Sequence, residues 1–170
     1  MEINDEIFEI VDENNKVIGT AKRSECHGNP ALLHRTVHVI VFHPDGRMLL
    51  QKRSMDKDIQ PGKWDTAVGG HLMPGEDFEI AAHREMQEEL GVPVNLPLKY
   101  LFDSKIRNRI ESENTRVYST TYEGPFDFPK EEIDDVKFWT VFELRNGLSE
   151  DYFTENLKVE LGKIFEMGII

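Results

Sequence analysis

Apolar and β-branched runs separated by short polar clusters predict β-strands over much of the chain. The strongest run, Val37–Phe42, is followed by the turn sequence Pro44-Asp45-Gly46, so the strand is expected to reverse into Arg47–Arg53. Asp12-Glu13-Asn14-Asn15 separates two further runs and predicts an N-terminal hairpin within residues 1–25. The remaining expected strands are Ile7–Val11, Val17–Ala21, Trp64–Val68, 98–107, 115–123 and Val136–Val141.

Two segments have the apolar spacing of helices. The first lies between the turn Pro74-Gly75-Glu76 and Gly91, a residue that ends helices, with an apolar side formed by Ile80, Ala81, Met86 and Leu90. The second lies within 150–170, with apolar positions at Leu157, Val159, Leu161, Ile164 and Phe165. Strands around one central helix, followed by a terminal helix, predict a mixed α/β (α+β) fold in a single domain over residues 1–170.

The first of these helices carries the residues that point to chemistry. Glu85, Glu88 and Glu89 lie three and four positions apart, so their carboxylates project from one turn. Carboxylates crowded in this way repel one another unless cations lie between them. Oxygen ligands on one face suit Mg²⁺ or Mn²⁺, and Mg²⁺ in proteins usually shares its coordination shell with substrate phosphates.

A solvated acidic helix face is the ordinary alternative for such a triplet. The surrounding residues favour a site instead. Gly69-Gly70 allows a close approach of the backbone to a ligand. Arg84 can pair with Glu76 or Glu88 and thereby hold the carboxylates in place.

The segment 70–92 resembles the Nudix box, G-x5-E-x7-R-E-U-x-E-E-x-G-U with U apolar, at every position. The resemblance implies a Nudix fold, an α/β/α sandwich with a mixed β-sheet, and metal-dependent hydrolysis of a diphosphate linkage in a nucleoside diphosphate derivative. It implies metal ligation by Glu85, Glu88 and Glu89, with the Gly70 carbonyl as a further ligand. Arg84 and Glu76 would be structural partners, and Gly91 completes the box.

Two alternatives for the catalytic base remain open. One is Glu85, and the other is a glutamate outside the box. Glu131 and Glu132 resemble the loop glutamates that take this role in many Nudix hydrolases, although a solvated acidic loop is the simpler interpretation of both.

A narrower resemblance, to the type 1 isopentenyl-diphosphate isomerases of the same superfamily, concerns residues mostly upstream of the box. The matching positions are His27, His34, Arg53, Lys57, Pro61-Gly62, Trp64 and the V-G-G-H sequence that ends at His71. The resemblance implies that the three histidines bind a second metal, for which Zn²⁺ or Mn²⁺ would be favoured, and that Arg53 and Lys57 bind diphosphate. Ordinary loop histidines and surface charges are the alternative interpretations.

The departures from the isomerases concern the chemistry itself. Their cysteine in V-C-G-H is replaced by Gly69, which has no group that can transfer a proton. Glu111 and Glu113 have the spacing of the later isomerase glutamates, in an uncertain register. Unlike the isomerases, this chain keeps an intact Nudix box, so hydrolysis is the favoured reaction. A nucleotide-sensing domain without catalysis and an isomerase-like activity are the alternatives.

Composition narrows the expected partners. The net charge of −12 over 170 residues argues against a nucleic-acid polymer or an anionic membrane as partner and favours a small diphosphate. The single cysteine, Cys26, excludes an internal disulfide and is compatible with a reducing compartment. No apolar run approaches the roughly 18 residues of a membrane span. We therefore expect a cytoplasmic protein, either a monomer or a homodimer.

Overall fold

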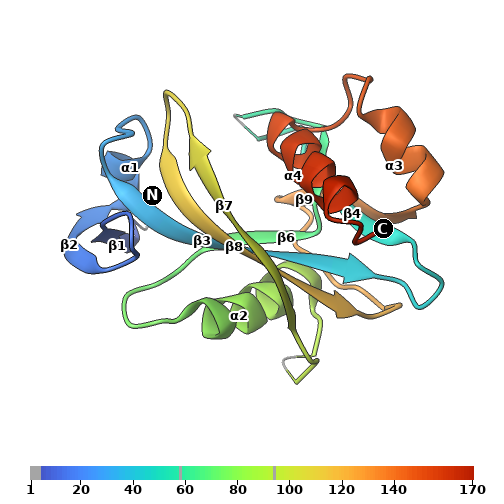
Figure 1. Ribbon diagram of the computed structural model, residues 1–170, viewed down its shortest axis with the longest axis horizontal. Coiled ribbons are helices and arrows are strands. Elements are labelled where there is room, and N and C mark those ends of the chain that lie inside the picture. Colours follow the sequence, from blue (N-terminus) through green and yellow to red (C-terminus); the bar gives the residue numbers. More distant parts are fainter. Residues whose placement is uncertain (1–4, 58, 94) are drawn as a thin grey trace.

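The computed structural model describes residues 5–57, 59–93 and 95–170, so the first residues of the expected hairpin segment 1–25 lie outside it. A mixed sheet forms the centre of the molecule (Figure 1). Its strands are β3 (Leu33–Phe42), β4 (Met48–Arg53), β5 (Trp64–Thr66), β6 (Val68–His71), β7 (Lys99–Arg107), β8 (Ser112–Thr121) and β9 (Ile133–Trp139).

The path through the sheet is β5-β4-β3-β8-β7, with β6 beside β3 and β9 beside β4. The central pair, β3 and β8, is parallel over ten register positions, and the remaining pairs of this sheet are antiparallel. The expected strand at Trp64–Val68 is wrong in one respect. It divides at Ala67 into β5, which pairs with β4, and β6, which pairs with β3.

Helix α2 (Phe78–Leu90) covers one face of the sheet (Figure 1). The Asp77 side chain accepts a hydrogen bond from the Ile80 backbone at the N-terminus, and Gly91 ends the helix with a left-handed φ of 64°. The helix buries an apolar side, as expected, and packs on valines of β3, but the buried stripe is shifted from the predicted one. Phe78, Ala81, Ala82, Met86 and Leu90 are buried, whereas Ile80 is 55% exposed.

Helix α4 (Glu155–Glu166) covers the opposite face, and α3 (Val141–Gly147) precedes it (Figure 1). The terminal helix is therefore shorter than the expected segment 150–170, and α3 was not expected. Leu157, Leu161 and Ile164 are buried against Ile40 and Leu50. Val159 was predicted on the same apolar side, but it is 70% exposed and lies outside the core. The two covered faces confirm the α/β/α sandwich of a Nudix fold.

The N-terminal hairpin is confirmed as a separate two-stranded sheet of β1 (Ile7–Val11) and β2 (Val17–Lys22), followed by the short helix α1 (Arg23–Cys26). Its inner side forms a small core around Phe8, Ile10 and the buried thiol of Cys26. Through Phe8 this unit reaches the start of β3, where His34 lies. Among the described residues, no helix is long and apolar enough to cross a membrane.

Candidate active site

A divergence between two neighbouring strands opens the sheet. Among the described residues, β3 and β4 pair at a single register position, Phe42 with Met48, and they then separate. Strand β6 lines the β3 side of the opening and β5 lines the β4 side. A cleft of about 580 Å³ lies here, and it is lined by residues of both helical layers, from Glu85 and Glu89 on α2 to Asn156 on α4.

The predicted carboxylates of α2 line this cleft together. Glu89 is the most firmly held, because its two carboxylate oxygens accept hydrogen bonds from Gln51 Nε2 and from the Gly69 backbone N–H, each at 3.2 Å. The Glu88 side chain is 59% exposed, whereas that of Glu85 is 13% exposed. Glu88 thus lies nearest to solvent, whereas Glu85 and Glu89 are more covered.

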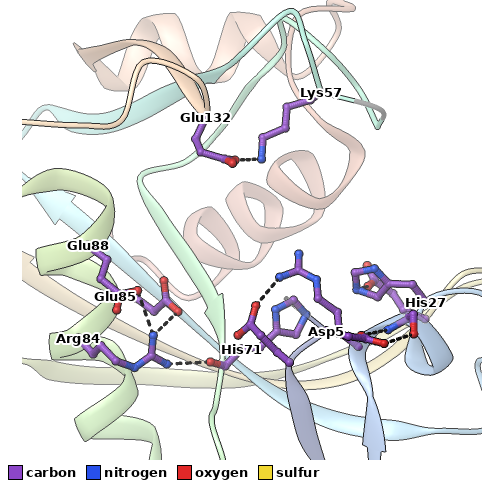
Figure 2. A network of polar contacts seen from close by, with 12 residues as sticks. Asp5, His27, Lys57, His71, Arg84, Glu85, Glu88 and Glu132 are labelled. Carbon is purple, nitrogen blue, oxygen red and sulfur yellow. Dashed lines mark hydrogen bonds and ion pairs between the residues drawn. The ribbon is translucent and has the colours of Figure 1, made fainter. Parts of the chain in front are cut away.

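Arg84 fixes the geometry around these carboxylates (Figure 2). Its guanidinium makes a two-pronged contact with Glu76, with Nε and one terminal nitrogen donating over 2.7 and 2.8 Å. It also donates to Glu85 over 2.8 Å and to Glu88 over 3.2 Å. A further hydrogen bond, of 3.0 Å, reaches the His71 carbonyl on β6. The sequence left a choice between Glu76 and Glu88 as partner, and the guanidinium contacts both.

Gly70 explains why the box needs a glycine at its start. A Cβ at this position would lie 2.2 Å from Glu85 Cδ, so any side chain would displace that carboxylate. The Gly70 backbone lines the same cleft. Its carbonyl as a metal ligand stays a prediction.

The electrostatics of Glu85 and Glu89 are those of carboxylates that need a cation. Burial raises the pKa of Glu85, although Arg84 opposes the shift. Burial and the neighbouring Glu85 carboxylate raise the pKa of Glu89 well above its ordinary value. A divalent cation between these groups would remove the repulsion and hold both in the ionised form.

A second cluster lies on the other side of β6. His34, His71, Glu111 and Glu113 each offer a ligand atom, and these four atoms lie within 4.8 Å of one another. Phe8 stacks on both imidazoles, at 4.4 Å from His71 and 5.2 Å from His34. His71 belongs to both parts of the site, because its carbonyl accepts from Arg84 while its ring faces this cluster (Figure 2).

His27 lies at the margin of this cluster rather than within it. Its Nε2 is 3.6 Å from Glu111 Oε2, and its ring is 5.7 Å from that of His71. The structure therefore brings two of the three predicted histidines together and adds Glu111 and Glu113, whose register was uncertain from the sequence. Strand β8 runs parallel to β3 and resolves the register, since Glu113 is the register partner of His34 and Glu111 directly precedes the strand.

The donor set of the His/Glu cluster fits a divalent metal. The buried Nε2 atoms of His71 and His27 lie 3.3 Å from Glu113 Oε2 and 3.6 Å from Glu111 Oε2, and neither makes a well-aligned hydrogen bond among the described residues. Burial lowers the pKa of both imidazoles, which keeps them neutral and able to ligate. Burial and Glu113 raise the pKa of Glu111 to about 7. Burial would also raise the pKa of Glu113, but the imidazoles of His34 and His71 hold it below its ordinary value.

The predicted diphosphate-binding residues also line the cleft, and both are paired with acidic side chains. Arg53 lies 3.6 Å from Asp65, and Lys57 contacts Glu132 across the opening from the box helix (Figure 2). Both loop glutamates are exposed, and of the two Glu132 lines the cleft.

Sequence reasoning missed His38, which lines the cleft from β3. Its Nδ1 lies 2.6 Å from Glu160 Oε2 on α4, a partner 122 residues away. The signal available in the sequence was the alternation His34, Thr36, His38, which places three polar side chains on one face of an otherwise apolar strand.

Comparisons with known proteins show the family to which this chain belongs. The model of the NUDIX domain matches residues 32–157. The chain is 35% identical over 153 residues to an isopentenyl-diphosphate Delta-isomerase of Streptomyces avermitilis, covering 87% of this chain and 78% of that protein. It is 34% identical over 157 residues to an uncharacterized Nudix hydrolase of Yersinia pestis, covering 90% and 82%. The chain therefore belongs to the Nudix family.

Among solved structures, the fold resembles the crystal structure of DR0079 from Deinococcus radiodurans, with a TM-score of 0.77 over 93% of this chain and 98% of that one, at 24% identity. The MutT protein of Methanosarcina mazei gives a TM-score of 0.68 over 82% and 96% at 17% identity. These likenesses show the fold. The domain match and the hydrolase relative support a pyrophosphohydrolase, and the domain implies hydrolysis of nucleoside diphosphate derivatives.

Proposed function

We propose that this protein hydrolyses a diphosphate linkage in a nucleoside diphosphate derivative or a related organic diphosphate, and that the reaction requires Mg²⁺ or Mn²⁺. The observation that carries the proposal is the position of the three box carboxylates at one cleft, with Arg84 holding two of them in place. Arg84 is itself fixed by Glu76 and by the His71 carbonyl. A solvated acidic face would have no need of this arrangement.

The residues take distinct roles in this reaction. Glu85, Glu88, Glu89 and the Gly70 carbonyl would hold the cations. When bound, these cations neutralise the diphosphate and lower the pKa of a coordinated water. Glu85 and Glu132 are the candidates for the base, since both line the cleft and Glu132 stands on the loop opposite α2. Arg53 and Lys57 would exchange their present acidic partners for phosphoryl oxygens when substrate enters.

The His/Glu cluster is proposed as a second metal site, with His34, His71, Glu111 and Glu113 as ligands and His27 next to Glu111. Its mixed nitrogen and oxygen donors favour Mn²⁺ or Zn²⁺ over Mg²⁺.

An isomerase-like activity on isopentenyl diphosphate is the second candidate. The His/Glu cluster and the isomerase relatives favour it. Gly69 argues against it, because the glycine supplies no proton to an allylic carbon. Hydrolysis is therefore the better supported reaction. A cytoplasmic location and a small diphosphate as partner complete the proposal.

The test is cleavage of a panel of nucleoside di- and triphosphates, nucleotide sugars, dinucleoside polyphosphates and isopentenyl diphosphate, with Mg²⁺, Mn²⁺ or neither. We expect metal-dependent cleavage that falls by more than roughly 100-fold in Glu89→Gln. The folding of this variant should be intact, since the substitution removes a charge whose burial is unfavourable. Glu79→Gln is the matched control, because Glu79 is an exposed carboxylate at the other end of α2.

Three results would contradict the proposal. Equal cleavage by the wild type and Glu89→Gln would show that the carboxylate of Glu89 is not needed for the reaction. Isomerisation of isopentenyl diphosphate without phosphate release would establish the second candidate. Tight binding of a panel member without any turnover would establish a nucleotide sensor.

A further inference from the structure

A row of polar side chains runs along one face of β3. His34, Thr36 and His38 alternate along the strand, and the next member of the row, Ile40, belongs to the apolar core beneath α4. His34 belongs to the His/Glu cluster, and Thr36 bonds Thr115 on β8 over 2.6 Å. His38 has no part in either group, and it lies at the cleft.

The imidazole of His38 is held in one orientation. Its Nδ1 lies 2.6 Å from one oxygen of Glu160, and the other Glu160 oxygen accepts a hydrogen bond of 2.6 Å from Thr66 Oγ1. The side chains of His38 and Glu160 are only 16% and 6% exposed. A charged pair that is taken out of water in this way is costly unless its geometry is well satisfied, as it is here.

The charge on His38 follows from its neighbours. Burial alone would lower the pKa of His38, but the Glu160 carboxylate, with smaller contributions from Asp65 and Glu113, raises it to about 9. The ring is therefore an imidazolium at neutral pH, with Nδ1 taken by Glu160 and Nε2 as its second N–H donor.

Gly69 leaves room beside the Nε2 edge of this ring. Gly69 is the register partner of His38 on β6, and a Cβ at Gly69 would lie 3.2 Å from His38 Cδ2 and 3.4 Å from Nε2. A larger side chain at this position would cover the edge or displace the ring. Gly69, which stands where the isomerases have their cysteine, thus leaves space at the cleft for the cationic His38 ring.

The geometry points to His38 as a phosphoryl-binding residue, whose Nε2–H donates to an oxygen of the diphosphate in the cleft while Glu160 positions the ring. This inference rests on the proposed function and adds a residue to it. Glu85, Glu88 and Glu89 make one side of the cleft acidic, and the cations Arg53 and Lys57 are paired with Asp65 and Glu132. A preformed imidazolium repels metal cations and attracts phosphate, so it suits the part of the substrate that the metals do not cover.

The first experiment measures binding of methylenediphosphonate, a diphosphate that cannot be hydrolysed, in the presence of Mg²⁺ by calorimetry. We expect His38→Gln to weaken binding by at least tenfold, whereas His43→Gln should bind as the wild type does. His43 is a suitable control because it lies at the start of the β3–β4 turn, where it pairs with Asp45. Equal affinity in His38→Gln and the wild type, or a wild type that does not bind the probe, would overturn the inference.

A second measurement avoids the unpaired Glu160 that His38→Gln leaves behind. In wild-type protein labelled with ¹⁵N-histidine, we expect the Nε2 resonance of His38 to shift on addition of methylenediphosphonate with Mg²⁺. Glu160→Gln should reduce that shift and weaken binding, and the double variant His38→Gln/Glu160→Gln should be no weaker than His38→Gln alone. An unperturbed resonance in a protein that has bound the probe would exclude the contact.

The two proposals fail in different ways. If the wild type binds the probe through His38 but cleaves no member of the diphosphate panel, hydrolysis fails and the phosphoryl contact stands. If cleavage depends on Glu89 but not on His38, and binding is unchanged in His38→Gln, hydrolysis stands and this inference fails.

Discussion

At the scale of single residues, two adjacent glycines serve opposite faces of one strand. Gly70 leaves room for Glu85 on the α2 side, whereas Gly69 leaves room for the His38 ring on the α4 side. Neighbouring strand residues face opposite ways, so a pair of glycines can bring side chains from two layers against one short piece of backbone. The V-G-G-H sequence therefore determines how closely Glu85 on one face and His38 on the other approach strand β6.

The His38–Glu160 pair predicts a pH dependence of stability. Because the pKa of His38 rises from 6.5 to about 9 on folding, its contribution is fully present below pH 6.5 and is lost as the pH rises through about 9. The free energy of unfolding of the wild type should fall between these values with a slope of up to about 1.4 kcal/mol per pH unit from this group. Urea unfolding should show that component in the wild type and in His43→Gln and not in His38→Gln. Parallel profiles in all three would contradict it.

The contacts of a residue could be predicted from the sequence where its partners are close along the chain. Glu76, Arg84 and the three box glutamates lie within one loop and helix, so spacing alone relates them. Glu113 and Glu160 contact His34 and His38 across 79 and 122 residues. Such contacts depend on the parallel register of β3 with β8 and on the docking of α4, which local patterns do not determine.

At the scale of elements, helix α2 shows how well the spacing of apolar residues predicts the buried side of a helix. The predicted apolar side included Ala81, Met86 and Leu90, which are buried, and Ile80, which is not. The true stripe also takes in Phe78 and Ala82, so it faces the sheet about one residue away from the expected centre. Ile80 is apolar in type but points to solvent.

This shift gives a matched pair of substitutions. Met86→Ala should lower the free energy of unfolding by about 2–5 kcal/mol, because Met86 is fully buried between α2 and the sheet. Ile80→Ala should change it by less than about 0.5 kcal/mol, since the side chain is exposed. Urea denaturation of the two variants provides the comparison. Similar losses in both would mean that Ile80 contributes to packing.

The other elements were also predictable only where local sequence patterns define them. The hairpin and the long strands were predictable because alternation and turn residues define them locally. The break at Ala67 arises from pairing, since β5 follows β4 and β6 follows β3 once those strands diverge. The short helices α1 and α3 carry too few turns for an apolar period to be recognised.

At the scale of the whole molecule, the charge of −12 is concentrated in part at two acidic clusters that share β6. Cations bound there would reduce the repulsion within the folded state. In Mn²⁺ at 100 times the dissociation constant, each site should stabilise the protein by about 2.7 kcal/mol, or roughly 5–10 °C in Tm.

Thermal unfolding with and without Mn²⁺, at matched ionic strength in NaCl, would measure this gain. Glu89→Gln and Glu113→Gln should each lose part of it, the double variant should lose nearly all, and Glu79→Gln should keep it. A full rise in Tm in the double variant would place the bound ions elsewhere.

The opening between β3 and β4 has a further consequence for how this protein can change. Each layer around the opening has its own apolar core, so the residues facing it from α2 and from α4 are anchored independently. Substitutions beneath α4 should then move His38 and Glu160 while the carboxylates on the other layer keep their spacing. The groups that face the cleft from the two layers would in this way be free to diverge separately within one small scaffold.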